Sequence, residues 1–302
     1  MSAHIPSSSV RQRFPFVKGH GTENDFVLLP DFDGILHPDL DEQTVRRLTD
    51  RHSGLGADGV IRVVRSVAVD DGRDMAADVE WFMDYRNADG SVAEMCGNGI
   101  RVMAGYLWSS GLVQGRGLAI GTRGGVRRVH DESGGRYTVE MGRPEQVSAD
   151  EPVRVITSWE IPEPDGAGGI AWPAVAVRAP NPHAVVFVED FSLVRPLREP
   201  PRVEPGGLFP DGFNLEYVAD REVRHIELRV WERGVGETRS CGTGVCAAAW
   251  ASMRRDGVKP GTTYTVDVPG GRLLVAERDD GTMLLTGPAV LGVSGEVDLD
   301  RL

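Results

Sequence analysis

Residues 239–250 read RSCGTGVCAAAW, and residues 94–106 carry a related stretch, EMCGNGIRVMAGY. In each stretch a cysteine, Cys96 or Cys241, stands directly before Gly-x-Gly and a run of residues with helical spacing. Nearly half of the 302-residue chain separates the two cysteines. One such motif in each half of the chain predicts two similar lobes that face each other.

The residues upstream of the two motifs repeat as well. A strand-like alternation of apolar and polar residues and then a polar loop precede each cysteine, and Asn87 and Glu232 each lie nine residues before it. Asn24 and Asn181 both lie in turn-rich loops that open onto apolar strands. The shared order of strand, polar loop, Cys-Gly-x-Gly and helix favours an internal repeat over a coincidence of glycines.

The composition is that of a globular protein, with 40% hydrophobic and 26% charged residues. A formal net charge of −12 argues against a nucleic-acid partner, and no apolar run approaches the roughly 18 residues of a membrane span. Three cysteines, with no even-numbered framework of close spacings, indicate the reducing cytoplasm. Residues 1–13 lack the apolar segment of a secretory signal, so we expect a disordered leader there.

The 38 glycines and 19 prolines predict many turns, short strands and few long helices. Pro144 to Gly169, rich in proline, acidic residues and glycine, is the best candidate for the boundary between lobes. We assign residues 14–145 to an N-terminal lobe with Cys96, completed by a C-terminal strand within 288–302. Residues 146–287 then form a C-terminal lobe with Cys241.

The two motifs suit acid/base chemistry. A cysteine at a helix start lies among unpaired backbone N–H groups and at the positive end of the helix dipole, and both favour the thiolate. The Gly-x-Gly that follows lets backbone amides approach an anion such as a carboxylate. Two such thiols across a cleft place a base on one face of a carbon and an acid on the other, which predicts inversion of a stereocentre.

The chain resembles the diaminopimelate epimerase family in segments spread over nearly its whole length. These segments are KGHGTENDFVLL (18–29), GLGADGV (54–60), YRNADGSVAEMCGNG (85–99), APNPHAV (179–185), GFNLE (212–216) and ERGVGETRSCGTG (232–244). The resemblance implies an α+β fold of two pseudo-symmetric lobes, each a mostly antiparallel sheet or barrel around a central helix, with the active site in the cleft between them. It also implies epimerisation of LL- to meso-diaminopimelate for lysine and peptidoglycan synthesis, without pyridoxal phosphate or metal, by a homodimer.

The resemblance also implies the site residues. Cys96 and Cys241 would be the acid/base pair, exchanging roles with the direction of reaction. The carboxylate at the reacting carbon would be held by Gly97, Asn98, Gly242 and Thr243. The rest of the substrate would be bound by Asn24, Asn87, Asn181, Asn214, Glu232 and Arg233, with Arg233 as a fork for the distal carboxylate. The thiol pKa values would be biased by His183 and Glu232.

Three positions call for separate interpretations. Many family members carry Gln in place of Gly59, so its contact is missing here or is supplied by a neighbour. The run Gly54-x-Gly56-x-x-Gly59 matches a dinucleotide-binding pattern, but it follows a helix and precedes a strand, which favours tight turns instead. Cys246, surrounded by alanines, is expected to be a packed core thiol.

Several alternatives remain open. A related two-cysteine racemase acting on proline or hydroxyproline is the nearest, although proline would leave Arg233 and the asparagines without a partner. A thiol redox protein would need a nearby resolving cysteine, and a zinc module would need a different ligand spacing. A further hypothesis is that Cys96 and Cys241 form an inactivating disulfide when the cleft is empty.

Overall fold

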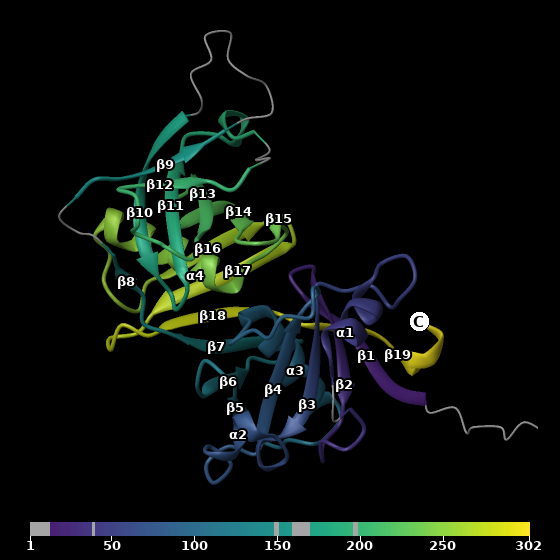
Figure 1. Cartoon of the computed structure of the whole chain (residues 1–302). Helices are drawn as coiled ribbons and strands as arrows, with labels where there is room; N and C mark the ends of the chain where they lie inside the picture. Colours follow the sequence, from purple (N-terminus) through teal and green to yellow (C-terminus); the bar gives the residue numbers. More distant parts are fainter. Residues whose placement is uncertain (1–12, 38–39, 148–150, 159–169, 196–198) are drawn as a thin grey trace, which may run out of the picture.

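The computed structural model describes residues 13–37, 40–147, 151–158, 170–195 and 199–302. Strands dominate it and form two lobes, each with one long helix among its strands (Figure 1). This is the α+β architecture that the sequence predicted. None of the helices in these residues is long and apolar enough to cross a membrane.

The N-terminal lobe consists of β1 (Arg13–Gly21), β2 (Asn24–Pro30), α1 (Glu42–Thr49), β3 (Gly59–Arg65), α2 (Asp70–Arg73), β4 (Trp81–Asn87), α3 (Gly97–Ser109), β5 (Gly117–Gly121), β6 (Arg127–Asp131), β7 (Arg136–Gly142) and β19 (Val290–Asp298). The C-terminal lobe consists of β8 (Glu145–Gln146), β9 (Val153–Thr157), β10 (Ile170–Arg178), β11 (Pro182–Val188), β12 (Arg202–Glu204), β13 (Asn214–Glu222), β14 (His225–Glu232), β15 (Gly236–Thr238), α4 (Gly242–Asp256), β16 (Thr263–Val268), β17 (Gly271–Glu277) and β18 (Met283–Pro288).

The strands follow the same order in both lobes. Neighbours in the N-terminal lobe run from β1 through β7 in chain order, and those in the C-terminal lobe are β10, β11, β13, β14, β16, β17 and β18. In each series the second and third strands pair in parallel, as do the fourth and fifth, and the other neighbours are antiparallel. The repeat of the cysteine motifs is therefore also a repeat of topology.

The lobes are joined where the two series end. The last strands, β7 and β18, pair antiparallel, with Gly142 opposite Met283 and Arg136 opposite Pro288. After each of them the chain crosses to the other lobe: β8 and β9 pair with β10, and β19 pairs with β1. Each lobe thus receives a strand from the other repeat, which fixes the two lobes to each other.

One predicted boundary needs correction. Arg13, which the sequence assigned to the leader, begins β1 and pairs with Asp298, whereas residues 1–12 lie outside the described residues. The predicted lobe boundary from Pro144 to Gly169 contains β8 and β9, where the chain crosses to the other lobe, and residues 148–150 and 159–169 of it lie outside the described residues. Strand pairing overrides local composition at Arg13, because β1 finds its partner β19 far along the chain.

The long helices α3 and α4 form the centres of the lobes. Residues Gly242–Met253 of α4 are all buried, and α4 contacts β10, β11, β13, β14, β16 and β17. A helix with small and apolar residues on every side belongs inside a protein, and Ala247–Ala249 let the strands approach closely. The helix ends at Gly257, whose left-handed backbone (φ 62°) lets its amide bond the carbonyls of Met253 and Arg254.

Strand β4 is buried on both faces, and its polar residue Asp84 is 1% exposed. The Asp84 carboxylate accepts hydrogen bonds from the guanidinium groups of Arg62, Arg86 and Arg123 at 2.9, 2.7 and 2.7 Å. We expect Asp84→Ala to lower the free energy of unfolding by about 3–5 kcal/mol, because it leaves buried positive charge without its partner. Urea denaturation measures the change.

The control is Asp33→Ala, which removes an exposed ion pair with Arg65. It should cost at most about 1 kcal/mol, since exposed pairs are screened by water. Equal losses in the two variants would contradict the assignment of Asp84 as the charge that holds this strand.

Candidate active site

Cys96 is the N-cap residue of α3. Its backbone is extended (φ −136°, ψ 118°), and its Sγ accepts a hydrogen bond from the amide of Gly99 at 3.4 Å. The same sulfur lies 3.7 Å from Oδ1 of Asn24, at the start of β2. The thiol therefore sits at the positive end of the helix dipole, where the motif predicted it.

Cys241 occupies the equivalent place on α4. It is the N-cap residue with an extended backbone (φ −125°, ψ 114°), and its Sγ accepts from the amide of Gly244 at 3.4 Å. The hydroxyl of Thr243 lies 3.3 Å from this sulfur, and Nδ2 of Asn214 lies 3.7 Å from it. Each thiol thus has one asparagine side chain 3.7 Å away, with the acceptor oxygen of Asn24 at Cys96 and the donor nitrogen of Asn214 at Cys241.

The first turns of the two helices lie directly against each other. A Cβ added to Gly242 would lie 3.1 Å from Cα of Gly97 and 3.4 Å from the amide nitrogen of Asn98. Such short distances leave no room for a side chain between the two backbones. The two N-cap thiols are therefore brought to the same junction between the lobes.

Hydrogen bonds across this junction fix the lobes together. The fully buried Asn98 donates from Nδ2 to Oδ1 of Asn24 at 3.2 Å and to the backbone oxygen of Ser240 at 3.2 Å. Ser240, which precedes Cys241, also shares a hydrogen bond of 2.8 Å with the hydroxyl of Thr22. Thr22 and Asn98 belong to one lobe and Ser240 to the other. These bonds therefore fix the position of one thiol relative to the other.

Burial dominates the electrostatics of the thiols. It raises the pKa of Cys96 to about 11, and the Glu232 carboxylate adds to the rise, whereas the amide of Gly99 and the guanidinium of Arg101 oppose it. Burial also raises the pKa of Cys241 well above its usual value, with Glu232 and Glu216 adding to the rise. Thiolate is therefore scarce at neutral pH, but each thiolate that forms is a strong base.

Glu232, the last residue of β14 in the C-terminal lobe, is a carboxylate close to the thiols. Its carboxylate accepts a hydrogen bond from the hydroxyl of Thr238 and another from the thiol of Cys241. Burial raises the pKa of Glu232, and the donors oppose this rise. Glu232 therefore contacts one thiol directly, which is the place expected of a residue that modulates its pKa.

His183 reaches the site through a second carboxylate. Its Nδ1 lies 2.7 Å from Oε1 of the fully buried Glu216, and its Nε2 lies 3.0 Å from Oδ1 of Asn181. Glu216 in turn packs on the first turn of α4, because a Cβ on Gly244 would lie 2.6 Å from its Oε1. Asn181 and His183 thus belong to the surroundings of Cys241.

Arg233 is placed at the site by its backbone. Its amide donates to Oδ1 of Asn214 at 3.0 Å, and its guanidinium donates to the carbonyl of Asp211 at 2.6 Å. The side chain is exposed and forms no ion pair within the described part of the chain. A guanidinium held at one end and free of carboxylates is suited to bind an anion.

Asn87 is the predicted site residue whose contacts do not lead to a thiol. Its Nδ2 donates to Oγ of Ser91 at 3.0 Å within the turn after β4. In the strand pairing it lies opposite Gly59. Asn87 is therefore at the edge of the site, beside Gly59.

The ring of Tyr85 occupies the space beside Gly59. A Cβ on Gly59 would lie 2.6 Å from Cε2 of Tyr85 and 3.2 Å from its hydroxyl. Burial raises the pKa of Tyr85 well above its usual value, and negative charge on Cys96, Glu232 and Cys241 adds to the rise. The neutral hydroxyl near both thiols is thus the neighbour that can replace a longer side chain at position 59.

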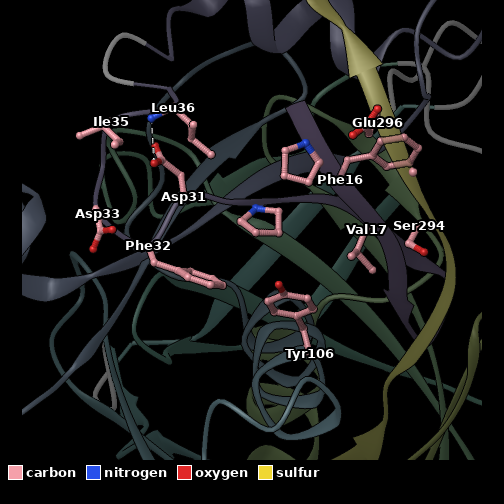
Figure 2. Close-up of a pocket in the computed structure, with 13 residues that line it drawn as sticks. Phe16, Val17, Asp31, Phe32, Asp33, Ile35, Leu36, Tyr106, Ser294 and Glu296 are labelled. Atoms are coloured by element: carbon pink, nitrogen blue, oxygen red, sulfur yellow. Dashed lines mark hydrogen bonds between the residues drawn. The ribbon is translucent and has the colours of Figure 1, made fainter. Parts of the chain in front are cut away.

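A surface pocket among the described residues lies elsewhere. Its volume is about 670 Å³, and its lining includes Phe16, Phe32, Ile35 and Tyr106 (Figure 2). None of the predicted site residues lines it. Its lining also includes the carboxylates of Asp31, Asp33 and Glu296 but neither Cys96 nor Cys241, so we place the site at the thiols.

Comparison with known proteins identifies the family of the chain. The family model for diaminopimelate epimerase matches residues 16–147 and 175–292. The chain belongs to the diaminopimelate epimerase family. The diaminopimelate epimerase of Streptomyces coelicolor is 52% identical over 95% of this chain and 96% of its own length. That of Thermobifida fusca is 46% identical over 95% of this chain and 99% of its own.

Solved structures extend the likeness of fold beyond diaminopimelate epimerases. A hydroxyproline epimerase from Agrobacterium vitis aligns with a TM-score of 0.65 at 14% identity, over 96% of this chain and 94% of that one. A predicted epimerase from Pseudomonas aeruginosa aligns with a TM-score of 0.65 at 15% identity, over 94% and 99%. At these identities the likeness concerns the fold alone.

Four residues of the site were missed by sequence reasoning in this diaminopimelate epimerase family member. They are Tyr85, Arg101, Glu216 and Ser240. Each lies in or beside a segment that carries the family resemblance, but its neighbours come from other strands, so sequence spacing gives no sign of the contact. Glu216 and Arg101 are the clearest signals in retrospect, because a charged residue within an otherwise buried strand or helix needs a partner.

The contact between the helix starts yields a stability prediction. Gly242→Ala should lower the free energy of unfolding by about 1–3 kcal/mol, because the new methyl group meets the backbone of Gly97. Gly292→Ala on β19 is the control, since a Cβ there meets no atom within 4 Å. Urea denaturation of both variants measures the difference, and an unaffected Gly242→Ala protein would contradict the tight junction.

Proposed function

We propose that this protein interconverts LL- and meso-diaminopimelate by a two-base mechanism with Cys96 and Cys241, without pyridoxal phosphate or metal, as a cytoplasmic enzyme of lysine and peptidoglycan precursor synthesis. The observation that carries the proposal is the junction at which two N-cap cysteines, one from each lobe, meet with only glycine backbone between their helix starts. Membership of the diaminopimelate epimerase family supports the choice of substrate.

The reaction is a pair of proton transfers at one carbon. One thiolate takes the α-proton and becomes a thiol, and the electron pair of the C–H bond remains as a carbanion delocalised into the carboxylate. The opposite thiol then gives its proton to the other face and becomes a thiolate. The product has the inverted configuration, and the negative charge has moved from one cysteine to the other.

The helix starts stabilise the charge that develops on the substrate. Backbone amides of Gly97 and Asn98 on α3, and of Gly242 and Thr243 on α4, lie in first turns where N–H groups lack helical partners. Such groups attract a carboxylate, and they attract it more strongly as the carbanion adds charge. A carboxylate bound by the free amides at both helix N-termini would present its α-carbon to both sulfurs.

The remaining polar groups suit the second amino-acid centre of diaminopimelate. Arg233 offers an exposed guanidinium for the distal carboxylate, and the side chains of Asn24, Asn87, Asn181, Asn214 and Glu232 offer donors and acceptors for the rest. The hydroxyl of Tyr85 supplies a further polar contact in place of a side chain at Gly59. Proline has no distal amino or carboxylate group, so it would leave these side chains unused.

Replacement of either cysteine tests the proposal. Cys96→Ser and Cys241→Ser should each lower kcat for conversion of LL- to meso-diaminopimelate by about 10²–10⁴-fold, because a hydroxyl is a much weaker acid/base group here. Cys246→Ser is the matched control and should keep most of the activity. Chiral chromatography of the product measures it. Equal activity in all three variants, or turnover of proline instead, would contradict the proposal.

The role of Arg233 gives a second prediction. Arg233→Ala should raise KM for diaminopimelate roughly 10- to 150-fold, which corresponds to a lost charge-assisted hydrogen bond of about 1.5–3 kcal/mol. Arg221→Ala is the control, since Arg221 is also exposed but pairs with Glu227. Steady-state kinetics with both variants measure the effect, and an unchanged KM for Arg233→Ala would remove Arg233 from the substrate site.

A homodimer is the proposed assembly. Among the described strands β19 pairs only with β1, and it exposes Val290 and Val293 at 44% and 59%. An unpaired edge with apolar side chains favours pairing with another chain. Sedimentation velocity should give twice the mass of one chain, and Val293→Lys should shift the protein toward monomer. A wild-type protein that sediments as a monomer would contradict the proposal.

A further inference from the structure

Arg101 is a buried cation without an anionic side chain to pair with. It is fully buried, on the second turn of α3, and its guanidinium donates to neutral acceptors. These are the backbone oxygens of Gly97 (3.2 Å) and Pro288 (3.3 Å), Oδ1 of Asn98 (2.9 Å) and Oγ1 of Thr22 (3.4 Å). No carboxylate of the described residues forms an ion pair with it.

The space around this guanidinium is shaped to hold it. A Cβ on Gly21 would lie 3.0 Å from Nη2 of Arg101, and one on Gly287 would lie 3.3 Å from its Cζ. Burial lowers the pKa of Arg101 to about 10, and the thiols of Cys96 and Cys246 oppose the fall. The guanidinium therefore keeps its charge at neutral pH, and cysteines are the groups nearby that can carry a balancing negative charge.

The equivalent position in the other repeat holds no charge. When the two motifs are aligned on their catalytic cysteines, Arg101 corresponds to Cys246. The nearby carboxylate, by contrast, lies at the start of α4 and not at the start of α3. At the first turn of α4, a Cβ on Gly244 would meet Oε1 of Glu216 at 2.6 Å, whereas at α3 the same atom on Gly99 would meet Cδ1 of Ile61 at 3.0 Å. The helix starts thus share a backbone geometry and differ in charge.

We propose that this difference sets the order in which the two thiols ionise: in the substrate-free protein Cys96 loses its proton more readily than Cys241, and Arg101 is the positioning residue that stabilises the thiolate of Cys96. This assignment rests on the proposed function of the two cysteines. A positive charge one turn below Cys96 favours its ionised form, and buried carboxylates around Cys241 disfavour ionisation there.

The other groups around the thiols do not reverse this order. The neutral Tyr85 on β4 interacts with both cysteines. Glu232 on β14 disfavours the thiolate of both cysteines but accepts a hydrogen bond from the thiol of Cys241 alone, which reinforces the same order. Glu216 on β13, paired with His183 on β11, acts on Cys241. Arg136 on β7 lies near Arg101, but it is at the lobe surface and only partly buried. The discriminating charges are Arg101 on one side and Glu216 and Glu232 on the other.

The proposal has a consequence for turnover. After one reaction that begins with the thiolate on Cys96, Cys96 carries the proton taken from the substrate, and Cys241 has given its own proton to the product. The free protein must then move one proton from Cys96 to Cys241, through solvent, to restore the thiolate on Cys96. Of the two singly ionised forms of the free protein, one substrate isomer therefore meets the more populated form and the other meets the less populated form.

The test is a titration of the cysteines in the intact, substrate-free protein. The chain has three cysteines, so protein labelled with ¹³C at cysteine Cβ gives three signals that report ionisation of each sulfur, assigned with single Cys→Ser variants. As pH rises, the Cys96 signal should move first. Arg101→Met should shift the Cys96 titration upward by about one pH unit, a tenfold change in thiolate population, and leave that of Cys241 in place.

Two variants separate charge from structure. Arg101→Lys keeps the charge and should leave the Cys96 titration close to wild type. Thr22→Val removes one hydrogen bond of the guanidinium and should also leave it unchanged. Glu216→Gln should lower the pH at which Cys241 titrates, and it keeps the proposal testable if Arg101→Met does not fold.

Two results would overturn the proposal: a wild-type protein in which Cys241 titrates first, or a folded Arg101→Met protein with an unchanged Cys96 titration. No substrate enters this experiment. A failure of the proposed function would appear as absent epimerisation with the titration order intact, so the two failures are distinguishable.

Discussion

The contact between the first turns of α3 and α4 is the constraint on which the rest of the structure depends. The backbones of Gly97 and Gly242 approach so closely that no side chain fits between them. Each helix can bring its N-terminus to that point only if a sheet surrounds it and the two sheets are joined. The pairing of β7 with β18, and the crossing of β8, β9 and β19 into the opposite lobes, supply that junction.

The same junction sets the electrostatic balance. Burial of both cysteines opposes thiolate formation, and the unpaired amides of two helix starts favour it. Burial has the larger effect, because the pKa values of both thiols are raised. This result suits proton abstraction from carbon. A thiolate whose conjugate acid has a high pKa takes a weakly acidic proton more readily than an ordinary thiolate would.

The sequence predicts the parts of the site that are local. The Cys-Gly-x-Gly motifs gave the starts of α3 and α4, the N-cap positions of Cys96 and Cys241, and the internal repeat, because capping and helical spacing are written in adjacent residues. The core position of Cys246 was also predicted, since the surrounding alanines signal it directly.

What the sequence could not give depends on residues brought together from distant strands. Asp84 lies at a polar position of an alternating strand pattern, yet its side chain is buried, and its carboxylate accepts hydrogen bonds from three arginines. Glu216 and Tyr85 reach the thiols only because β13 and β4 pass the starts of α4 and α3. Arg13 joins β1 because β19 returns from the C-terminus to pair with it. No local pattern encodes such long-range contacts.

The most direct measurement of the central claim, that two thiols act on opposite faces of one carbon, is the origin of the α-hydrogen during epimerisation in D₂O. At early times, mass spectrometry should find solvent deuterium at the inverted carbon of the product and none in the remaining substrate, in both directions of reaction. That pattern requires separate donor and acceptor groups. Deuterium appearing equally in substrate and product, or product that retains the substrate's own hydrogen, would show one group acting on both faces and would contradict the account.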